Sequence, residues 1–308
     1  MPAVQVGQGS IGGEEPIGPV RERSGLPDNQ GVTPLKRELE RLYRLYNHRR
    51  YVHPDPLEFL YPWRDPLDRE VVGLLAACLA YGRVRQILDS VAGVLHRLES
   101  PAKVVRESSL ASLQKRLSGF RHRFTTGEAV GWLLHGAGRQ IERHGSLQKC
   151  FCAGLKEEDS KVLPALEAFV AALADERTNE GYWVLPRPAA GSACKRLHLF
   201  LRWMVRRDKV DPGGWERVPA SKLIVPLDVH MHRIGRALGW TQRKQAGVRA
   251  ALDVTNALRS ICPSDPLRYD FALTRLGIRP ETDLEGFLKR CEGKSEVKQQ
   301  WRVKKIRV

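Results

Sequence analysis

The sequence predicts an all-α protein. Apolar residues recur at helical spacing in one segment after another, and alternating, strand-like runs are nearly absent. No repeat of fixed period occurs, which argues against a repeat architecture. The 308 residues, 42% of them hydrophobic, are enough to bury a sizeable core in one large domain or two small ones.

Two helices near the start are the best marked. Between residues 35 and 50, leucines and a tyrosine follow helical spacing, and Thr33 and Pro34 suit the N-cap and the first helical position. The run from Asp65 to about Ala80 is apolar on all sides, which predicts a central core helix. Further helices are expected at about 84–99, 109–117, 127–143, 146–154, 161–176, 193–206, 229–238, 243–259 and 265–276.

The two ends of the chain have a different composition. Residues 1–33 are rich in glycine, proline and polar residues, so we expect a disordered leader there. One helical domain is expected over 34–291, followed by a basic C-terminal tail over 292–308. The tail's lysines and arginines would add nonspecific affinity for phosphate, or would do little.

Positive charge is concentrated in one part of the chain. The formal net charge is +16, and the span from Arg187 to Arg249 holds 14 Lys/Arg against four Asp/Glu. Such an excess attracts a polyanion such as nucleic acid. An arginine-rich proteome would give a basic surface without any partner, but it does not explain the concentration in one segment.

Several classes of protein do not fit the sequence. No apolar run approaches the roughly 18 residues that cross a bilayer, and the N-terminus has no apolar signal region. The six cysteines are scattered among apolar or helical patterns, which indicates reduced thiols rather than a disulfide framework. His230 and His232 lack cysteine or acidic partners at metal-site spacing, so no metal is expected. We therefore expect a cytoplasmic protein without a cofactor.

The span 161–207 is typical of two helices joined by a turn rich in glycine and proline. Gly191 or Ser192 is the expected N-cap of the second helix. The first amides of a helix have no intrahelical acceptor, so this turn can direct backbone N–H groups at a phosphate. An ordinary helical hairpin is the alternative.

Two segments carry a family resemblance. They are Gly191-Ser-Ala-Cys-Lys195-Arg-Leu-His-Leu-Phe-Leu-Arg-Trp-Met204 and Ile224-Val-Pro-Leu-Asp228-Val-His-Met-His-Arg233. Together they resemble the signature of the helix-hairpin-helix DNA glycosylase superfamily, in which a glycine-containing hairpin ends in a lysine and a later segment supplies an aspartate. The second is especially similar to the 8-oxoguanine glycosylase branch. From about residue 34 to 290, the chain also resembles an uncharacterised bacterial branch, the DUF2400 family, with the further mark Asp265-Pro-Leu-Arg-Tyr-Asp-Phe-Ala-Leu.

The resemblance implies a two-lobed helical fold with a DNA-binding cleft between the lobes. Two features differ from the usual pattern: the hairpin lacks the Gly-x-Gly before its lysine, and Asp228 follows Lys195 by 33 residues, a wide spacing. The excess corresponds to the insertion 208–215. The four clustered cysteines that bind an iron–sulfur cluster in some members are absent, so no cluster is expected.

The resemblance assigns the chemistry to Lys195 and Asp228. An unprotonated lysine can attack C1′ of the sugar and form a Schiff base, which permits strand cleavage. A carboxylate near C1′ stabilises the oxocarbenium-like transition state and can deprotonate a nucleophile. The alternatives are a Lys195 that contacts phosphate or is merely exposed, and an Asp228 that caps the helix from residue 229. Lys209 and Lys222 are weaker candidates.

Other residues are candidates for DNA contact. The resemblance implies that His230 contacts phosphate, and the hairpin and its basic surroundings add Gly191, Ser192, Arg196 and Arg233. Tyr81 and Arg83 lie in a Gly-containing turn where related enzymes place the wedge that fills the gap left by a flipped base. Candidates for the base pocket or wedge are Tyr81, Trp203, Trp215 and Phe271, although Trp203 and Phe271 are better explained as core.

The resemblance, together with the basic charge, therefore implies an enzyme that acts on damaged double-stranded DNA, and we expect it to be monomeric and nucleoid-associated. The expected activity is removal of an oxidised purine, 8-oxoguanine first, with AP-lyase activity through Lys195. A monofunctional glycosylase that uses only Asp228 is an alternative. A noncatalytic helix-hairpin-helix protein that only grips DNA, or a protein that binds structured RNA, are the others.

Overall fold

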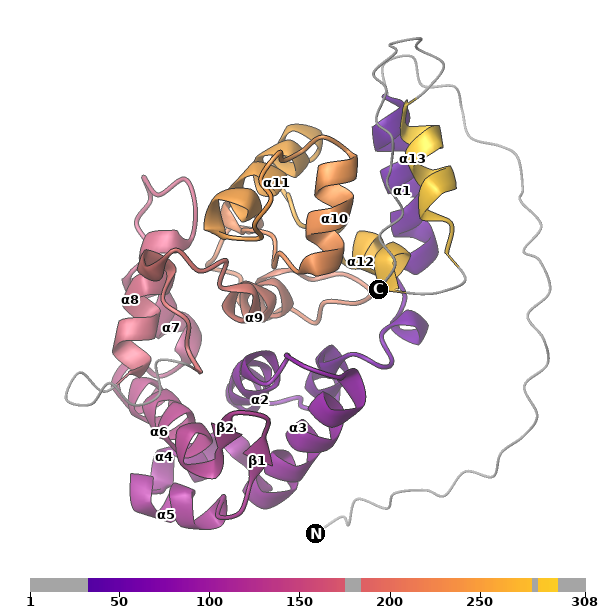
Figure 1. Ribbon diagram of the computed structural model, residues 1–308. Helices are drawn as coiled ribbons and strands as arrows, with labels where there is room; N and C mark the ends of the chain where they lie inside the picture. Colours follow the sequence, from indigo (N-terminus) through magenta and orange to yellow (C-terminus); the bar gives the residue numbers. More distant parts are fainter. Residues whose placement is uncertain (1–32, 175–183, 279–281, 293–308) are drawn as a thin grey trace, which may run out of the picture. The chain divides into compact units, whose positions relative to one another are not determined.

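The computed structural model describes residues 33–174, 184–278 and 282–292 (Figure 1). Helices make up most of these segments, and the described strands form a single two-stranded hairpin. The prediction of an all-α protein is therefore confirmed. Apart from Thr33 and Glu292, the predicted leader and the predicted basic tail lie outside the described residues.

The elements follow one another in a simple order. They are α1 (Pro34–Tyr46), the 3-10 helices η1 (Arg49–Tyr51) and η2 (Pro56–Leu60), α2 (Pro66–Cys78), α3 (Val84–Leu98), α4 (Pro101–Glu107), α5 (Leu110–Arg116), β1 (Arg121–His122), β2 (Thr125–Thr126), α6 (Gly127–His144), α7 (Leu147–Ala153), α8 (Leu163–Leu173), η3 (Pro188–Ala190), α9 (Lys195–Val205), η4 (Ala220–Lys222), α10 (Val229–Ala237), α11 (Val248–Ile261), α12 (Asp270–Ile278) and α13 (Leu284–Glu292).

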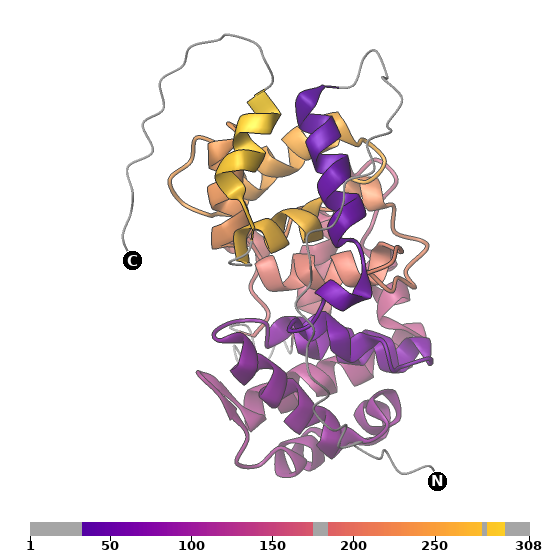
Figure 2. The same ribbon diagram turned by 90° about the vertical axis from the view of Figure 1, so that its right-hand side faces the viewer.

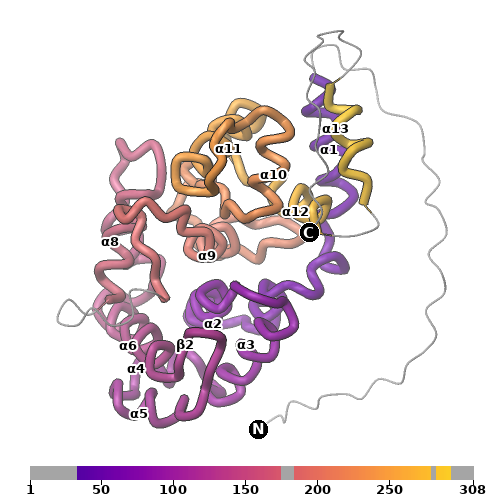
Figure 3. Tube along the Cα trace, in the orientation of Figure 1, coloured from indigo at the N-terminus to yellow at the C-terminus, as the bar shows by residue number. Residues whose placement is uncertain are grey.

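The first two α-helices begin at their predicted capping residues. Thr33 Oγ1 accepts a hydrogen bond from the backbone N–H of Lys36, and Pro34 occupies the first helical position. The Asp65 carboxylate accepts two backbone N–H bonds at the start of α2. Every residue of α2 from Glu70 to Cys78 is buried, as expected for a central core helix. The helix packs against α9 and η2, and α2 and α9 can be followed in the trace of Figure 3.

Several helix boundaries differ from the predicted ones. The helix predicted over 35–50 ends at Tyr46, and a separate 3-10 helix follows it. The helix predicted over 243–259 begins only at Val248. Thr241 and Arg243 lie in the loop before it and donate hydrogen bonds to the Asp253 carboxylate within the helix. The one predicted over 265–276 begins at Asp270, after a turn closed by a hydrogen bond from Arg268 N to Asp265 O.

Among the α-helices and strands, three features were not predicted at all. The first is α4. The second is the β-hairpin, whose four paired residues are too few to show periodicity. The third is α13, which lies beyond the last predicted helix and packs beside α1 (Figure 2). The start and the end of the described chain are therefore paired with each other.

The insertion 208–215 is held firmly in place after α9. Asp211, 1% exposed, accepts hydrogen bonds from the guanidinium groups of Arg202 and Arg206. At the other end of the insertion, Trp215 Nε1 donates to Glu70 Oε1 at 2.7 Å, and Glu70 also accepts two backbone N–H bonds at the start of α7. Buried polar partners therefore tie this loop to α2, α7 and α9.

Two further findings bear on the class of protein. None of the helices in the described segments has both the length and the apolar character needed to cross a bilayer. All six cysteines lie in described segments, and none of them forms a disulfide bond.

Candidate active site

Lys195 is the first residue of α9. The helix is preceded by η3 and by Gly191, which adopts a left-handed conformation with φ of 76°. The N-cap is Cys194, so the prediction that Gly191 or Ser192 caps this helix was wrong. Gly191 instead closes the η3 turn, and Ser192 Oγ accepts a bond from Cys194 N at 3.2 Å outside the helix. Cys194 itself is left-handed with φ of 44°, an uncommon conformation for a residue with a side chain.

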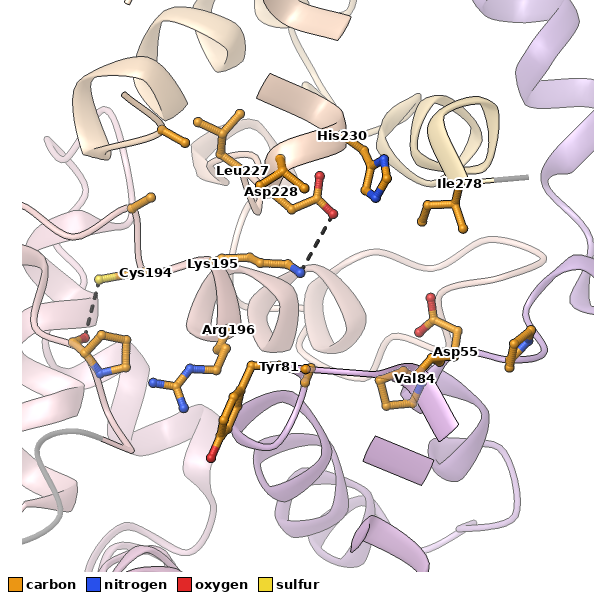
Figure 4. A pocket seen from close by; sticks show the side chains of 18 of the residues that line it. Asp55, Tyr81, Val84, Cys194, Lys195, Arg196, Leu227, Asp228, His230 and Ile278 are labelled. Carbon is orange, nitrogen blue, oxygen red and sulfur yellow. Dashed lines mark hydrogen bonds and ion pairs between the residues drawn. The ribbon is translucent and has the colours of Figure 1, made fainter. Parts of the chain in front are cut away.

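Asp228 is the N-cap of α10. Its Oδ1 accepts a hydrogen bond from Met231 N at 2.8 Å. Its Oδ2 lies 3.7 Å from Lys195 Nζ, and the two side chains point toward each other in Figure 4. The Lys195 side chain is 38% exposed and that of Asp228 16%. The fold therefore brings together two groups that are 33 residues apart, and the capping bond leaves one carboxylate oxygen facing the amine.

The pair lies at a cavity of about 1020 Å³. Four stretches of chain supply most of its wall: residues 53–56, the turn at 80–84, the segment 192–196 that starts α9, and the segment 227–230 that starts α10. Pro186, Ala246, Arg275 and Ile278 complete it. The cavity combines apolar side chains with an amine, two carboxylates, two imidazoles and two guanidinium groups, which is typical of a ligand site.

The part of the chain from residue 55 to 279 matches the profile of a family described as "Protein of unknown function (DUF2400)". This match covers more than half of the 308 residues. The chain belongs to the DUF2400 family. No curated protein and no solved structure matches it significantly. The matched region of this DUF2400 protein contains the whole cavity except His53 and Pro54.

Tyr81 is the aromatic side chain that lines the cavity of this DUF2400 protein. Its hydroxyl donates to His122 O at 2.9 Å and bonds Thr125 Oγ1, so the ring is fixed against the β-hairpin. The guanidinium carbon of Arg196 lies 5.2 Å from the centre of the Tyr81 ring, and Arg196 Nη1 donates to Cys78 O. Arg196 therefore connects the start of α9 to the end of α2 through a hydrogen bond, and it also lines the cavity.

The other predicted contact residues separate into two groups. Ser192 and His230 line the cavity with Lys195 and Asp228. Gly191 lies in a shallow basic depression formed by the segment 243–250, which includes Arg243, Lys244 and Arg249. Arg83 is exposed beside the β-hairpin, and Arg233 is exposed one turn along α10 from the cavity. His232 bonds the backbone oxygen of Arg243 and is not a cavity residue.

Among the aromatic candidates, Trp203 and Phe271 are core residues, as the sequence favoured, whereas Trp215 was wrong as a pocket or wedge residue. Trp203, Trp215 and Phe271 are at most 4% exposed, and none of them lines the cavity. Trp215 belongs to an aromatic cluster with Phe151, Phe169 and Phe200. The secondary lysines are also elsewhere: Lys209 is exposed outside the cavity, and Lys222 Nζ donates to the backbone oxygens of Lys156 and Glu157.

The part of the cavity wall formed by Asp55, Arg275 and Ile278 was not predicted from the sequence. Asp55 caps η2 through Leu57 N, and its Oδ2 accepts from Arg275 Nη2 at 2.8 Å. Ile278, 49% exposed, adds an apolar surface beside them. The proline before and after Asp55 predicts a turn there, but no local signal joins residue 55 to residue 275.

A buried charge network supports α9 behind the site. Asp270, 1% exposed, accepts from Arg202 Nη1 at 2.6 Å. Burial raises the pKa of Asp270, the nearby Asp228 carboxylate raises it further, and the Arg202 guanidinium counteracts both. Asp228 is therefore close enough to the network to interact with it electrostatically.

Proposed function

We propose that this protein is a DNA glycosylase with AP-lyase activity that removes an oxidised purine, 8-oxoguanine first. The observation that carries the proposal is the 3.7 Å separation between Lys195 Nζ and Asp228 Oδ2 at the wall of a cavity of about 1020 Å³. An amine and a carboxylate in contact are the two groups that the reaction needs. The resemblance of their sequence segments to helix-hairpin-helix glycosylases supports the same assignment.

The reaction begins with proton transfer from the Lys195 ammonium to Asp228 Oδ2. The freed lone pair on Nζ attacks C1′, the N-glycosidic bond breaks, and the base leaves with the bonding electrons and takes up a proton. Nζ, now bonded to C1′, loses a proton, its lone pair opens the C1′–O4′ bond, that proton ends on O4′, and Nζ and C1′ form a protonated Schiff base. Loss of a C2′ proton expels the 3′ phosphate and cuts the strand, and water then releases the lysine.

Asp228 is held for this task by its own helix. The hydrogen bond from Met231 N to Oδ1 fixes the carboxylate, so Oδ2 stays directed at the amine. Positive charge develops on the sugar as the base leaves, and a fixed carboxylate stabilises that charge without reorganisation.

The remaining cavity wall suits a flipped purine. Pro54, Val84 and Ile278 offer apolar contacts, and the Asp55 carboxylate offers hydrogen-bond acceptors. A carboxylate is an acceptor only, so it fits a base edge that carries N–H donors, as the edge of guanine and of 8-oxoguanine does. The base must leave the duplex to reach this wall.

The surroundings suit a phosphate backbone. Gly191 and the three cations Arg243, Lys244 and Arg249 share a shallow depression next to the start of α9. In the proposal this depression grips a phosphate, and DNA lies in a cleft between two helical lobes. A noncatalytic DNA-binding protein would use the same depression. Only an assay of catalytic activity therefore distinguishes that alternative from a glycosylase.

The test is a panel of duplex oligonucleotides, each with one damaged base, scored separately for base release and for strand nicking. The proposal predicts both with 8-oxoguanine and neither with undamaged guanine. Asp228→Asn abolishes both, whereas the matched control Asp89→Asn, an exposed position on α3, leaves them unchanged. Base release without nicking indicates a monofunctional enzyme, and neither event with any lesion contradicts the proposal.

A further inference from the structure

The tip of the β-hairpin exposes an aromatic ring to solvent. Arg123 and Phe124 connect β1 to β2, and Phe124 is 73% exposed. Of the large hydrophobic side chains that are exposed in the described segments, Phe124 is the aromatic one. Exposure of a phenylalanine ring to water is unfavourable because of the hydrophobic effect. Binding of a partner that covers the ring would therefore lower the free energy.

Three arginines share a depression with the ring. Arg83, Arg121 and Arg123 line a shallow depression with Phe124 and Gln86, and no acidic residue lines this depression in the described part of the chain. The guanidinium carbon of Arg123 lies 5.6 Å from the centre of the Phe124 ring. The tip therefore combines an aromatic face with concentrated positive charge, which is the combination that binds stacked bases and their phosphates.

The base of the hairpin is rigid. His122 is fully buried, its Nδ1 bonds Ser90 Oγ at 2.9 Å and its Nε2 bonds Tyr81 O at 3.0 Å. Burial lowers the pKa of His122. Tyr81 in turn donates its hydroxyl to His122 O and lines the cavity. Gly82 fits against the Arg123 side chain, so the turn at 81–83 and the hairpin tip form one unit.

We infer that this hairpin inserts Phe124 into the base stack of DNA next to the cavity, while Arg83, Arg121 and Arg123 contact the flanking phosphates. The inference rests on the proposed function and adds to it the element that fills the space left by the extruded base. Charge complementarity favours nucleic acid over a protein partner, because the tip offers three cations and no carboxylate. Tyr81 links the inserted ring to the site where the base is received.

A fluorescence experiment tests the insertion directly. The probe is a duplex with a tetrahydrofuran abasic analogue opposite 2-aminopurine, whose emission rises when it is unstacked. The wild-type protein should raise the emission on binding. Phe124→Ala should lose this rise and bind roughly tenfold more weakly, and Phe124→Tyr should retain both. Phe124 is exposed, so all three proteins should have the same melting temperature.

The salt dependence of DNA affinity tests whether the three arginines contact phosphate. Removal of one cation that binds a phosphate lowers the slope of log affinity against log salt by about 0.9, so replacing Arg83, Arg121 and Arg123 with alanine should flatten it clearly. Arg37→Ala, an exposed arginine on α1, is the matched control and should leave the slope unchanged. If wild type binds and Phe124→Ala binds and fluoresces equally, the hairpin inference is overturned and the proposed function stands. If wild type does not bind the duplex, both fail.

Discussion

At the scale of single residues, the two groups proposed to act are fixed by different means. Lys195 is placed by the start of α9, and Asp228 by its own capping bond to Met231 N. Both residues were singled out from the sequence. Tyr81, Ser192 and His230, which line the cavity, were predicted only as residues that contact DNA. Asp55 and Arg275 were not predicted as cavity residues. They are 220 positions apart in the sequence, and only tertiary packing brings them together.

Substitutions at Asp228 should separate its capping role from its proposed chemical role. Asparagine caps a helix as well as aspartate does, so Asp228→Asn should unfold with a free energy close to that of wild type. Alanine cannot accept the Met231 N–H bond, so Asp228→Ala should lose about 1 kcal/mol. Both should lose glycosylase activity by a factor of about 10² or more. Denaturant titration and single-turnover assays measure the two effects, and an active Asp228→Asn enzyme would exclude the role in catalysis.

At the scale of elements, the long apolar periodic segments were predicted well, whereas two short elements, α4 and the β-hairpin, were not. The core helix α2 and the first helix α1 begin where their caps indicate. The helix predicted from residue 193 begins at Lys195 as α9. A 3-10 turn that ends at Gly191 and a left-handed Cys194 precede it. The β-hairpin that carries Phe124 has too few residues to leave a pattern, so its exposed tip emerged only from the structure.

Helix packing gives a prediction for the glycines of α6. A Cβ at Gly138 would overlap the backbone oxygen of Val105 in α4, which cannot retreat like a flexible side chain. Gly138→Ala should therefore destabilise the protein by about 1–3 kcal/mol. The matched control is Gly93→Ala in α3, where nothing lies within 4 Å of the added methyl.

Since alanine favours a helix over glycine, the control should be stabilised by about 0.5–1 kcal/mol. Chemical denaturation of the two variants beside wild type measures both changes. Equal stability of Gly138→Ala and Gly93→Ala would contradict the close packing of α6 against α4.

At the scale of the whole molecule, composition and periodicity predicted the helical class and the polyanion partner, but not the arrangement of the helices. That arrangement depends on buried polar contacts such as those of Arg202, Arg206 and Asp211, which no local pattern reveals. The segments predicted as leader and tail lie almost wholly outside the described residues, so their roles remain predictions, as does the polyanion partner.

Stability should depend on pH through His198. This histidine on α9 is 1% exposed, and burial lowers its pKa from 6.5 to about 4. The unfolded chain therefore binds a proton more readily, and stability is full above pH 6.5 and is lost as the pH falls toward 4. The loss from this residue should be about 3 kcal/mol.

The measurement is the free energy of unfolding at several pH values for wild type and His198→Leu. The variant should lack this part of the decrease, because leucine takes up no proton. His96→Gln, an exposed position on α3, should follow wild type. An unchanged pH profile in His198→Leu would show that other groups cause the acid sensitivity.

The central claim is that Lys195 attacks the sugar, and borohydride trapping tests it most directly. Reduction of the Schiff base adds hydride at C1′ and leaves a stable amine bond between protein and DNA. With duplex DNA that contains 8-oxoguanine, wild type and the exposed control Lys209→Gln should be trapped equally, and Lys195→Gln should give no adduct. Absence of an adduct with wild type, or equal trapping of Lys195→Gln, would contradict the claim.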